Sequence, residues 1–292
     1  MKDNLRYALW AINGITVQHN YLSKKIQIND ELIDIVATDY DGVNQLSDLH
    51  NDWVENKIMK NISTSITYTP IPHLNVYVTT LNPVKNLGFH KFAFPFNLAL
   101  ELVYHDSYVS HTSEYVPKGG VSCPGWVGWD GKYSKDSHTI NPKTFDKVVQ
   151  IYNSISKFTE SELSVLYSLT KISKIRNIKI ELLCLWTFIE GYWYNGQGSS
   201  KVKKSFERML LHDYAKGNQN LREAVTEKVK SQNSNFRRDT IDDIRHILAH
   251  GMDKRNSTIW STNQWEAIRE QRKLLFEIIT VSLINRIKNN IV

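Results

Sequence analysis

The hydrophobic period of the chain changes near residue 142, and this change constrains the fold more than any other feature. Before it, apolar and polar residues alternate in short runs such as Leu32–Val36 and Leu74–Val78, a pattern typical of strands. After it, apolar residues recur every three or four positions, as in amphipathic helices. A chain of 292 residues has room for two domains. We therefore predict an α+β fold, with a β-rich N-terminal domain over residues 1–142 and an all-α helical bundle over residues 143–292.

Turn signals divide the first half into its expected strands. The pair Asn13-Gly14 predicts a hairpin that joins the apolar run 7–12 to the run 15–17. Residues 44–60 have the spacing of one amphipathic helix. Residues 87–105 are nearly all apolar and contain Pro95, so we expect one or two strands there, broken at the proline.

Helix signals are denser in the second half. Thr159 and Glu162 have the spacing of a capping box, and so do Ser261 and Gln264. Between these two sites, apolar stripes predict helices over about residues 178–193, 202–210 and 221–229. Another helix follows Ser261 and continues toward the end of the sequence.

Composition narrows the class of protein. The chain is 41% hydrophobic and 23% charged, which is ordinary for a globular protein. Its two cysteines, Cys123 and Cys184, lie far apart, which argues against a disulfide framework or a cysteine-based zinc site and fits a reducing compartment. We see no run of 18 apolar residues and no secretory signal, so we expect a cytoplasmic protein without a membrane span.

The two halves differ in charge. Residues 1–142 hold 11 Lys and Arg against 14 Asp and Glu, a net charge of −3, whereas residues 143–292 hold 25 against 16, a net charge of +9. A basic half beside a mildly acidic half suggests that the basic half binds a polyanion such as RNA. The alternative is that these charges belong to ordinary solvated helix faces.

One short segment of the second half, residues 239–251, carries the candidate chemistry. Thr240 can cap the start of a helix there, and Gly251 can end it. Ile241, Ile244 and Leu248 form an apolar stripe that would face the core. The segment therefore predicts a short helix with both ends marked.

Three basic residues surround the end of this short helix. Arg245 and His250 are five residues apart, and His246 and His250 share a face. An imidazole that titrates near neutrality suits general acid–base chemistry, and an arginine beside it can bind a phosphate oxygen and offset developing charge. No His, Asp or Glu cluster shows metal-ligand spacing, so we expect no metal and no cofactor.

The stretch Arg245-His246-Ile247-Leu248-Ala249-His250 resembles the Arg-polar-x-x-x-His signature of HEPN domains, above all the Apea-type HEPN domains of bacterial antiphage proteins. The resemblance covers residues 143–292, so the bundle is expected to be HEPN-like. It implies a metal-independent ribonuclease that acts as a homodimer, with Arg245, His250 and His246 at a cleft between two chains. HEPN domains often carry an acidic residue near the arginine, which makes Glu190 the candidate to orient Arg245 by an ion pair; the alternative is a solvent-facing glutamate.

Further expectations follow from this resemblance. Arg237, Arg238, Lys254 and Arg255 flank the motif and could bind the RNA backbone. A ribonuclease of antiphage defence or of a toxin system needs control, so residues 1–142 are expected to select the substrate, to sense a phage-derived trigger or to hold the nuclease inactive. A second Arg–His pair, Arg208 and His212, is one residue closer than the family spacing and is not counted as a match.

Two other functions fit the sequence. The bundle could be a non-catalytic dimerisation or nucleotide- or RNA-binding module, in which Arg245 and His250 grip an anion. Alternatively, the first half could be the active part, with His105, Asp106 and His111 as its cluster of titratable residues.

Overall fold

The computed structural model describes residues 6–13, 15–17, 22–28, 31–38, 73–80, 93–104, 110–115, 138–196, 201–236, 243–250 and 260–289. Contacts divide the chain into two compact units, residues 1–159 and 160–292. The predicted boundary after residue 142 coincides with the start of a helix, and the assignment of domains stays a prediction.

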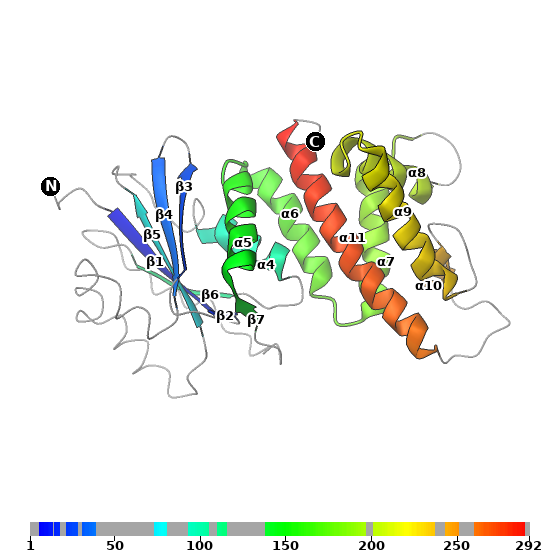
Figure 1. Ribbon diagram of the computed structural model, residues 1–292, viewed down its shortest axis with the longest axis horizontal. Helices are drawn as coiled ribbons and strands as arrows, with labels where there is room; N and C mark the ends of the chain where they lie inside the picture. The colour runs from blue at the N-terminus through cyan, green and yellow to red at the C-terminus, as the bar shows by residue number, and fades with distance from the viewer. Residues whose placement is uncertain are drawn as a thin grey trace. The chain divides into compact units, whose positions relative to one another are not determined.

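The described strands of the first unit form two sheets (Figure 1). A five-stranded sheet has the order β3-β4-β5-β1-β6, and all its neighbouring strands are antiparallel. A second sheet pairs β2 and β7 in parallel. The strands are β1 (Arg6–Asn13), β2 (Ile15–Val17), β3 (Leu22–Ile28), β4 (Glu31–Thr38), β5 (His73–Thr80), β6 (Ser110–Tyr115) and β7 (His138–Ile140).

The strand pairing corrects one predicted hairpin and confirms the position of other strands. The runs 32–36 and 74–78 lie in β4 and β5. However, β1 and β2 do not pair with each other, because β1 lies between β5 and β6 while β2 pairs with β7. A single residue, Gly14, separates β1 from β2, which is too short for the two-residue loop that an Asn-Gly turn requires.

The apolar stretch around Pro95 is a helix, α4 (Ala93–Val103), so the strands predicted for residues 87–105 are wrong. Pro95 lies in the first turn, where the missing N–H would have no partner within the helix anyway. Phe96, Ala99 and Leu100 are fully buried. A helix buried on most sides is continuously apolar, and such a run cannot be distinguished from a buried strand by its period.

The predicted fold class is also wrong. Residues 94–289 are 83% helical and contain no sheet of their own, since the described β6 and β7 pair with strands from the first 20 residues. The region read as the end of a β-rich domain therefore contributes the helix α4. The expected helix over residues 44–60 lies outside the described residues.

A capped helix, α5 (Pro142–Ile155), packs against α4. The Asn141 side chain accepts a hydrogen bond from the Thr144 backbone N–H at 3.0 Å, and the Thr144 hydroxyl oxygen accepts one from the Asn141 N–H at 2.9 Å. Pro142 occupies the first helical position, where its fixed φ suits the helix. The Phe96 and Tyr152 rings meet edge to face at 5.2 Å, which joins the two helices.

The second unit is helical throughout its described part (Figure 1). Its elements are α6 (Glu160–Ser173), α7 (Ile178–Trp193), α8 (Lys201–Arg208), a π-helical turn η2 (Met209–Tyr214), α9 (Gln219–Ser234), α10 (Asp243–His250) and α11 (Thr262–Lys288). These elements confirm the helices predicted over residues 178–193, 202–210 and 221–229. Among the described residues, no helix combines the length and the apolar character needed to cross a membrane.

Side-chain caps fix where the longest helices begin. Asn177 accepts hydrogen bonds from the N–H groups of Lys179 and Ile180, so α7 starts directly after it. The capping box predicted for Ser261 and Gln264 is confirmed, with reciprocal bonds of 2.9 and 3.3 Å. The start of α11 was therefore readable from sequence.

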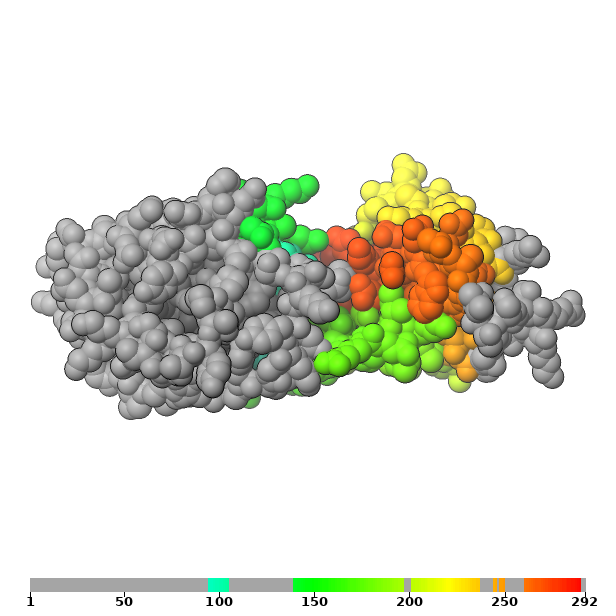
Figure 2. Space-filling model, turned by 90° about the horizontal axis from the view of Figure 1, so that it is seen from below, coloured from blue at the N-terminus to red at the C-terminus, as the bar shows by residue number. Residues whose placement is uncertain are grey.

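The core of the second unit forms where α11 packs against α7. Leu275, Ile279 and Leu283 of α11 are fully buried, and so are Leu185 and Trp186 of α7. Burying each such side chain contributes about 1.5–3 kcal/mol. In Figure 2, the orange atoms of α11 lie between the yellow atoms of α9 and the green atoms of α6 and α7. The long helix thus contacts both sides of the bundle.

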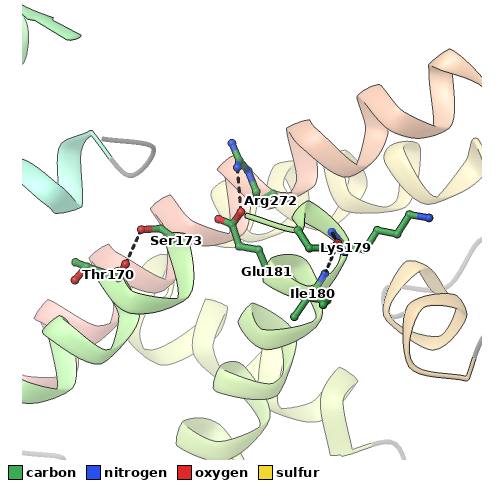
Figure 3. Close-up of polar contacts among 7 residues, drawn as sticks. Thr170, Ser173, Lys179, Ile180, Glu181 and Arg272 are labelled. Atoms are coloured by element: carbon green, nitrogen blue, oxygen red, sulfur yellow. Dashed lines mark hydrogen bonds and ion pairs between the residues drawn. The ribbon is translucent and has the colours of Figure 1, made fainter. Parts of the chain in front are cut away.

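Buried polar contacts fix the position of α11 along its neighbours. Arg272 forms an ion pair with Glu181 of α7 at 3.0 Å (Figure 3), and the Glu181 side chain is 1% exposed. Gln271 accepts a hydrogen bond from the Trp186 indole N–H at 3.3 Å and donates one to Asn233 of α9 at 2.9 Å. Since each contact needs a defined geometry, together they select one register of α11 against α7 and α9.

A third polar contact lies near the C-terminal end of α11. The carboxylate of Asp213, in η2, accepts hydrogen bonds from the Trp193 indole N–H at 2.6 Å and from Arg286 at 3.4 Å. The Asn285 side chain donates to the Asp213 carbonyl at 2.8 Å. The π-helical turn is thereby attached to α7 and to α11.

An aromatic contact joins the end of α9 to the start of α11. The Phe236 and Trp260 rings meet edge to face at 5.5 Å. The Lys179 ammonium of α7 lies 3.7 Å from the Trp260 ring centroid and 4.9 Å from that of Trp265. The residues on either side of the stretch that carries α10 are therefore joined in one aromatic cluster.

The buried ion pair gives the first testable prediction. Arg272→Met should lower the free energy of unfolding by about 3 kcal/mol, because it leaves the Glu181 carboxylate buried without its guanidinium partner. Urea unfolding followed by circular dichroism measures the change. Arg269→Met, on the same helix but exposed, is the matched control and should change stability by less than about 0.5 kcal/mol. Equal losses in the two variants would contradict a specific role for the pair.

Candidate functional site

Glu190 lies near the C-terminal end of α7, on the edge of that helix's buried face. Its neighbours Ile189 and Trp193 are fully buried in the core, which fixes the rotation of the helix. The Glu190 side chain is 26% exposed, so it lies at the border between core and solvent. The packing of α7 thus holds this carboxylate in one direction.

Arg245 lies in α10, the short helix predicted to carry the candidate chemistry. The described bounds, Asp243–His250, confirm a helix that ends at the second histidine. Ile244 is 1% exposed and anchors α10 in the core, where α10 contacts α7. The helix is eight residues long and marginal by itself, so tertiary contacts such as this one must hold it.

An ion pair joins the two helices at this point. Arg245 Nη2 donates to Glu190 Oε2 at 3.1 Å, across 55 residues of sequence. The ion pair expected from the sequence is therefore present, at a glutamate that is also partly exposed to solvent. Both side chains are about a quarter exposed, at 25% for Arg245 and 26% for Glu190.

The Arg245 guanidinium retains hydrogen-bonding capacity beyond this pair. Its Nε–H group is buried and has no hydrogen-bond partner among the described residues. A guanidinium presents five donors in a planar fork, and one face of that fork can bind a carboxylate while the other binds an anion. The ion pair therefore orients Arg245 and leaves donors available for a phosphate oxygen.

The two histidines occupy the expected positions in the helix. The backbone of α10 includes His246 and ends at His250, whereas their side chains lie outside the described atoms. Arg245 and His250 are five positions apart along the helix, which corresponds to a rise of about 7.5 Å and a rotation of about 140°. An arginine side chain is long enough to bridge much of that separation.

Several predicted site residues lie outside the described residues. These are the four flanking cations and two residues of the alternative cluster in the first half: Arg237, Arg238, Lys254, Arg255, His105 and Asp106. The backbone of His111 lies in β6, where it pairs with Ile12.

Other chemistry is limited within the described part of the chain. No group of three His, Cys, Asp or Glu side chains there could hold a metal ion. Burial raises the pKa of the Cys184 thiol, and the nearby Glu181 carboxylate raises it further. This thiol therefore stays protonated near neutrality and is a poor nucleophile.

Sequence reasoning missed the buried acids and one pocket. Glu181 and Asp213 are fully buried, although acidic residues are almost never buried without a partner. Residues of α7, α8, η2 and α9 line an open pocket of about 850 Å³. Its lining includes Arg208 and His212, the pair whose spacing does not match the HEPN signature. The alternation of basic and apolar residues in α8 could have indicated a basic helix face. It does not indicate that α9 lines the other side of the pocket.

Compared with family models, with curated proteins and with solved structures, the chain matches none. The HEPN resemblance therefore depends on the residues of α7 and α10 described above.

The Arg245–Glu190 contact should be measurable by a double-mutant cycle. Because both side chains are partly exposed, we expect a coupling energy of about 0.5–1 kcal/mol from Glu190→Gln, Arg245→Gln and the double variant. Urea unfolding of the four proteins measures it. A coupling energy indistinguishable from zero would show that Glu190 does not hold Arg245 in solution.

Proposed function

We propose that the chain is a metal-independent endoribonuclease of an antiphage defence or toxin system. The observation that supports it is the contact of Arg245 with Glu190, which is the pairing that the HEPN resemblance implies between the motif arginine and an acidic residue of a neighbouring helix. The proposed active site lies where two chains face each other, with one α10 from each, and the proposed substrate is RNA.

RNA carries its own nucleophile, the 2′-hydroxyl beside the phosphorus. Proximity therefore supplies much of the rate enhancement. His250 takes the proton from the 2′-hydroxyl, the 2′-oxygen forms a bond to phosphorus, and the bond from phosphorus to the 5′-oxygen breaks. The partner's His250 protonates the leaving 5′-oxygen. The products are a 2′,3′-cyclic phosphate and a 5′-hydroxyl.

Arg245 and Glu190 serve this reaction through charge and position. The guanidinium stabilises the extra negative charge that the phosphorane-like transition state carries. Glu190 holds the guanidinium so that its remaining donors point to one place, which reduces the reorganisation needed during the reaction. Glu190 is therefore a positioning residue, and His246 orients the phosphate or its neighbour.

The second candidate is a binding module without catalysis. Glu190 offsets part of the positive charge of Arg245, so less charge remains to stabilise a transition state, whereas the remaining guanidinium donors can still hydrogen-bond to an anion. In that case, two bundles would dimerise and bind RNA or a nucleotide through Arg245 and His250.

Cleavage in the presence of EDTA tests the proposal. The wild-type chain should cut labelled RNA into fragments with 2′,3′-cyclic phosphate ends, and His250→Ala should be slower by about 10²–10⁴-fold, because it removes the acid–base group. Arg245→Ala should also cut RNA more slowly than the wild type. Arg269→Ala, an exposed control, should retain the wild-type cleavage rate. Gel electrophoresis and mass spectrometry of the fragments measure both effects.

Two outcomes would contradict the nuclease. One is a His250→Ala variant as active as the wild type. The other is RNA binding by both proteins without cleavage by either, on a panel of structured and unstructured RNAs; this outcome would favour the binding module.

A further inference from the structure

A pocket outside the Arg245–Glu190 site is lined by four Lys and Arg residues and by three Glu residues. It has a volume of about 850 Å³ and lies among the end of α7, α8, η2 and α9, within the second unit. Its volume falls in the range of roughly 300–1,000 Å³ that is usual for sites of small ligands. The pocket begins at Trp193 and Tyr194, one helical turn after Glu190.

The cations and acids of this pocket differ in exposure. Arg208 and Arg222 are half-buried, whereas the acidic side chains Glu207, Glu223 and Glu227 are exposed. Because water screens the exposed charges more strongly, the two half-buried arginines contribute most to the attraction for an anion.

Three of these cations differ in the contacts that they already make. Lys230 forms an ion pair with Glu227 at 2.8 Å, and Arg222 donates to Gln219. Arg208 forms no ion pair with another described residue, so its guanidinium is the cation whose donors are available to a ligand. Arginine binds phosphate through two parallel N–H groups, which gives geometric selectivity as well as affinity.

A buried hydroxyl lies beside this arginine. Ser205 is fully buried, lines the pocket, and its Oγ has no hydrogen-bond partner among the described residues. Ser205 and Arg208 are three residues apart on α8, so their side chains are neighbours on one face of the helix. A buried hydroxyl without a partner is unfavourable, and a phosphate oxygen placed next to Arg208 would accept a hydrogen bond from the Ser205 O–H.

The backbone after Arg208 supports a ligand site as well. The π-helical turn η2 starts at the next residue and places Leu210, Leu211 and His212 in the lining. Such turns are rare, and they occur frequently at functional sites. Tyr194 contributes an aromatic ring to the lining of the same pocket. The Lys201 ammonium lies 5.2 Å from the centroid of this ring.

We infer that this pocket binds the phosphate group of a nucleotide, with Arg208 and the Ser205 hydroxyl on the phosphate oxygens and the base against Tyr194. The nucleotide is either a free nucleoside monophosphate or one unit of an RNA strand, since both present the same phosphate and base. The inference does not depend on cleavage at Arg245 and His250, because it concerns binding at a separate pocket.

Calorimetric titration of the full chain tests the inference, with three probes: inorganic phosphate, AMP, and an eight-nucleotide single-stranded RNA. Arg208→Gln should weaken AMP binding about tenfold or more, because a charge-assisted contact is lost. Ser205→Ala, which removes a single hydroxyl, should weaken it by a smaller factor. Lys203→Gln is the matched control, since Lys203 is an exposed cation of the same helix outside the pocket lining, and it should bind AMP as the wild type does.

The probes also distinguish the source of the phosphate. Tighter binding of AMP than of the RNA, with both weakened by Arg208→Gln, assigns a free nucleotide; tighter binding of the RNA, with the same loss, assigns a strand subsite. Circular dichroism confirms that each variant is folded. Absence of binding of all three probes to the folded wild type, or equal losses in Arg208→Gln and Lys203→Gln, would overturn the inference. His250→Ala should bind AMP normally, which separates this result from a failure of the nuclease proposal.

Discussion

The packing of α11 against α7 is the interaction on which the rest of the second unit depends. Apolar burial supplies most of the stabilisation, since the facing side chains of both helices are almost fully removed from water. Apolar contacts alone tolerate small shifts along the helix axes. The buried ion pair of Arg272 with Glu181 removes that freedom, because a displaced guanidinium would leave a carboxylate in the core without its partner. Burial therefore gives the bundle its stability, and the polar pairs give it one register.

That register determines the geometry of the candidate site. One helix, α7, carries Glu181 in its first turn, Trp186 in its middle, and Glu190 and Trp193 in its last turns. When the core fixes α7, it also fixes where the Glu190 carboxylate lies, and thereby where Arg245 of α10 can be held. The same helix end contributes Trp193 and Tyr194 to the pocket beside α8. Two polar sites thus share one rigid support.

Local signals in the sequence were sufficient for many elements of the second unit. Caps are local, so the start of α11 at the Ser261–Gln264 box could be predicted without tertiary information. The contact of Glu190 with Arg245 could also be anticipated, because a family pattern supplied the long-range pairing that the period does not. By contrast, a proline in an apolar run predicts a broken strand, whereas Pro95 lies in the first turn of a buried helix. Likewise, Asn13-Gly14 predicts a hairpin, whereas the strands on its two sides pair with strands far along the chain.

The remaining errors have one physical origin. Burial of Glu181 and Asp213 depends on the arrival of Arg272 and Arg286 from α11, and no local pattern encodes which distant cation will come. The buried Ser205 hydroxyl is similar, because its environment depends on how α8 meets its neighbours. Sequence patterns indicate which face of a helix is apolar, whereas they do not indicate which polar side chains the fold will enclose.

The edge-to-face contact of Phe236 with Trp260 has a consequence for how this chain could diversify. The residues on either side of the stretch that bears α10 meet at this contact, and the Lys179 ammonium lies over the Trp260 ring. Ile244 places α10 in the core, and Arg245 joins it to Glu190 of α7. Exchanges within α10 that keep these two residues would therefore disturb the bundle little. The rest of α10 could then change in sequence while the other helices keep their packing.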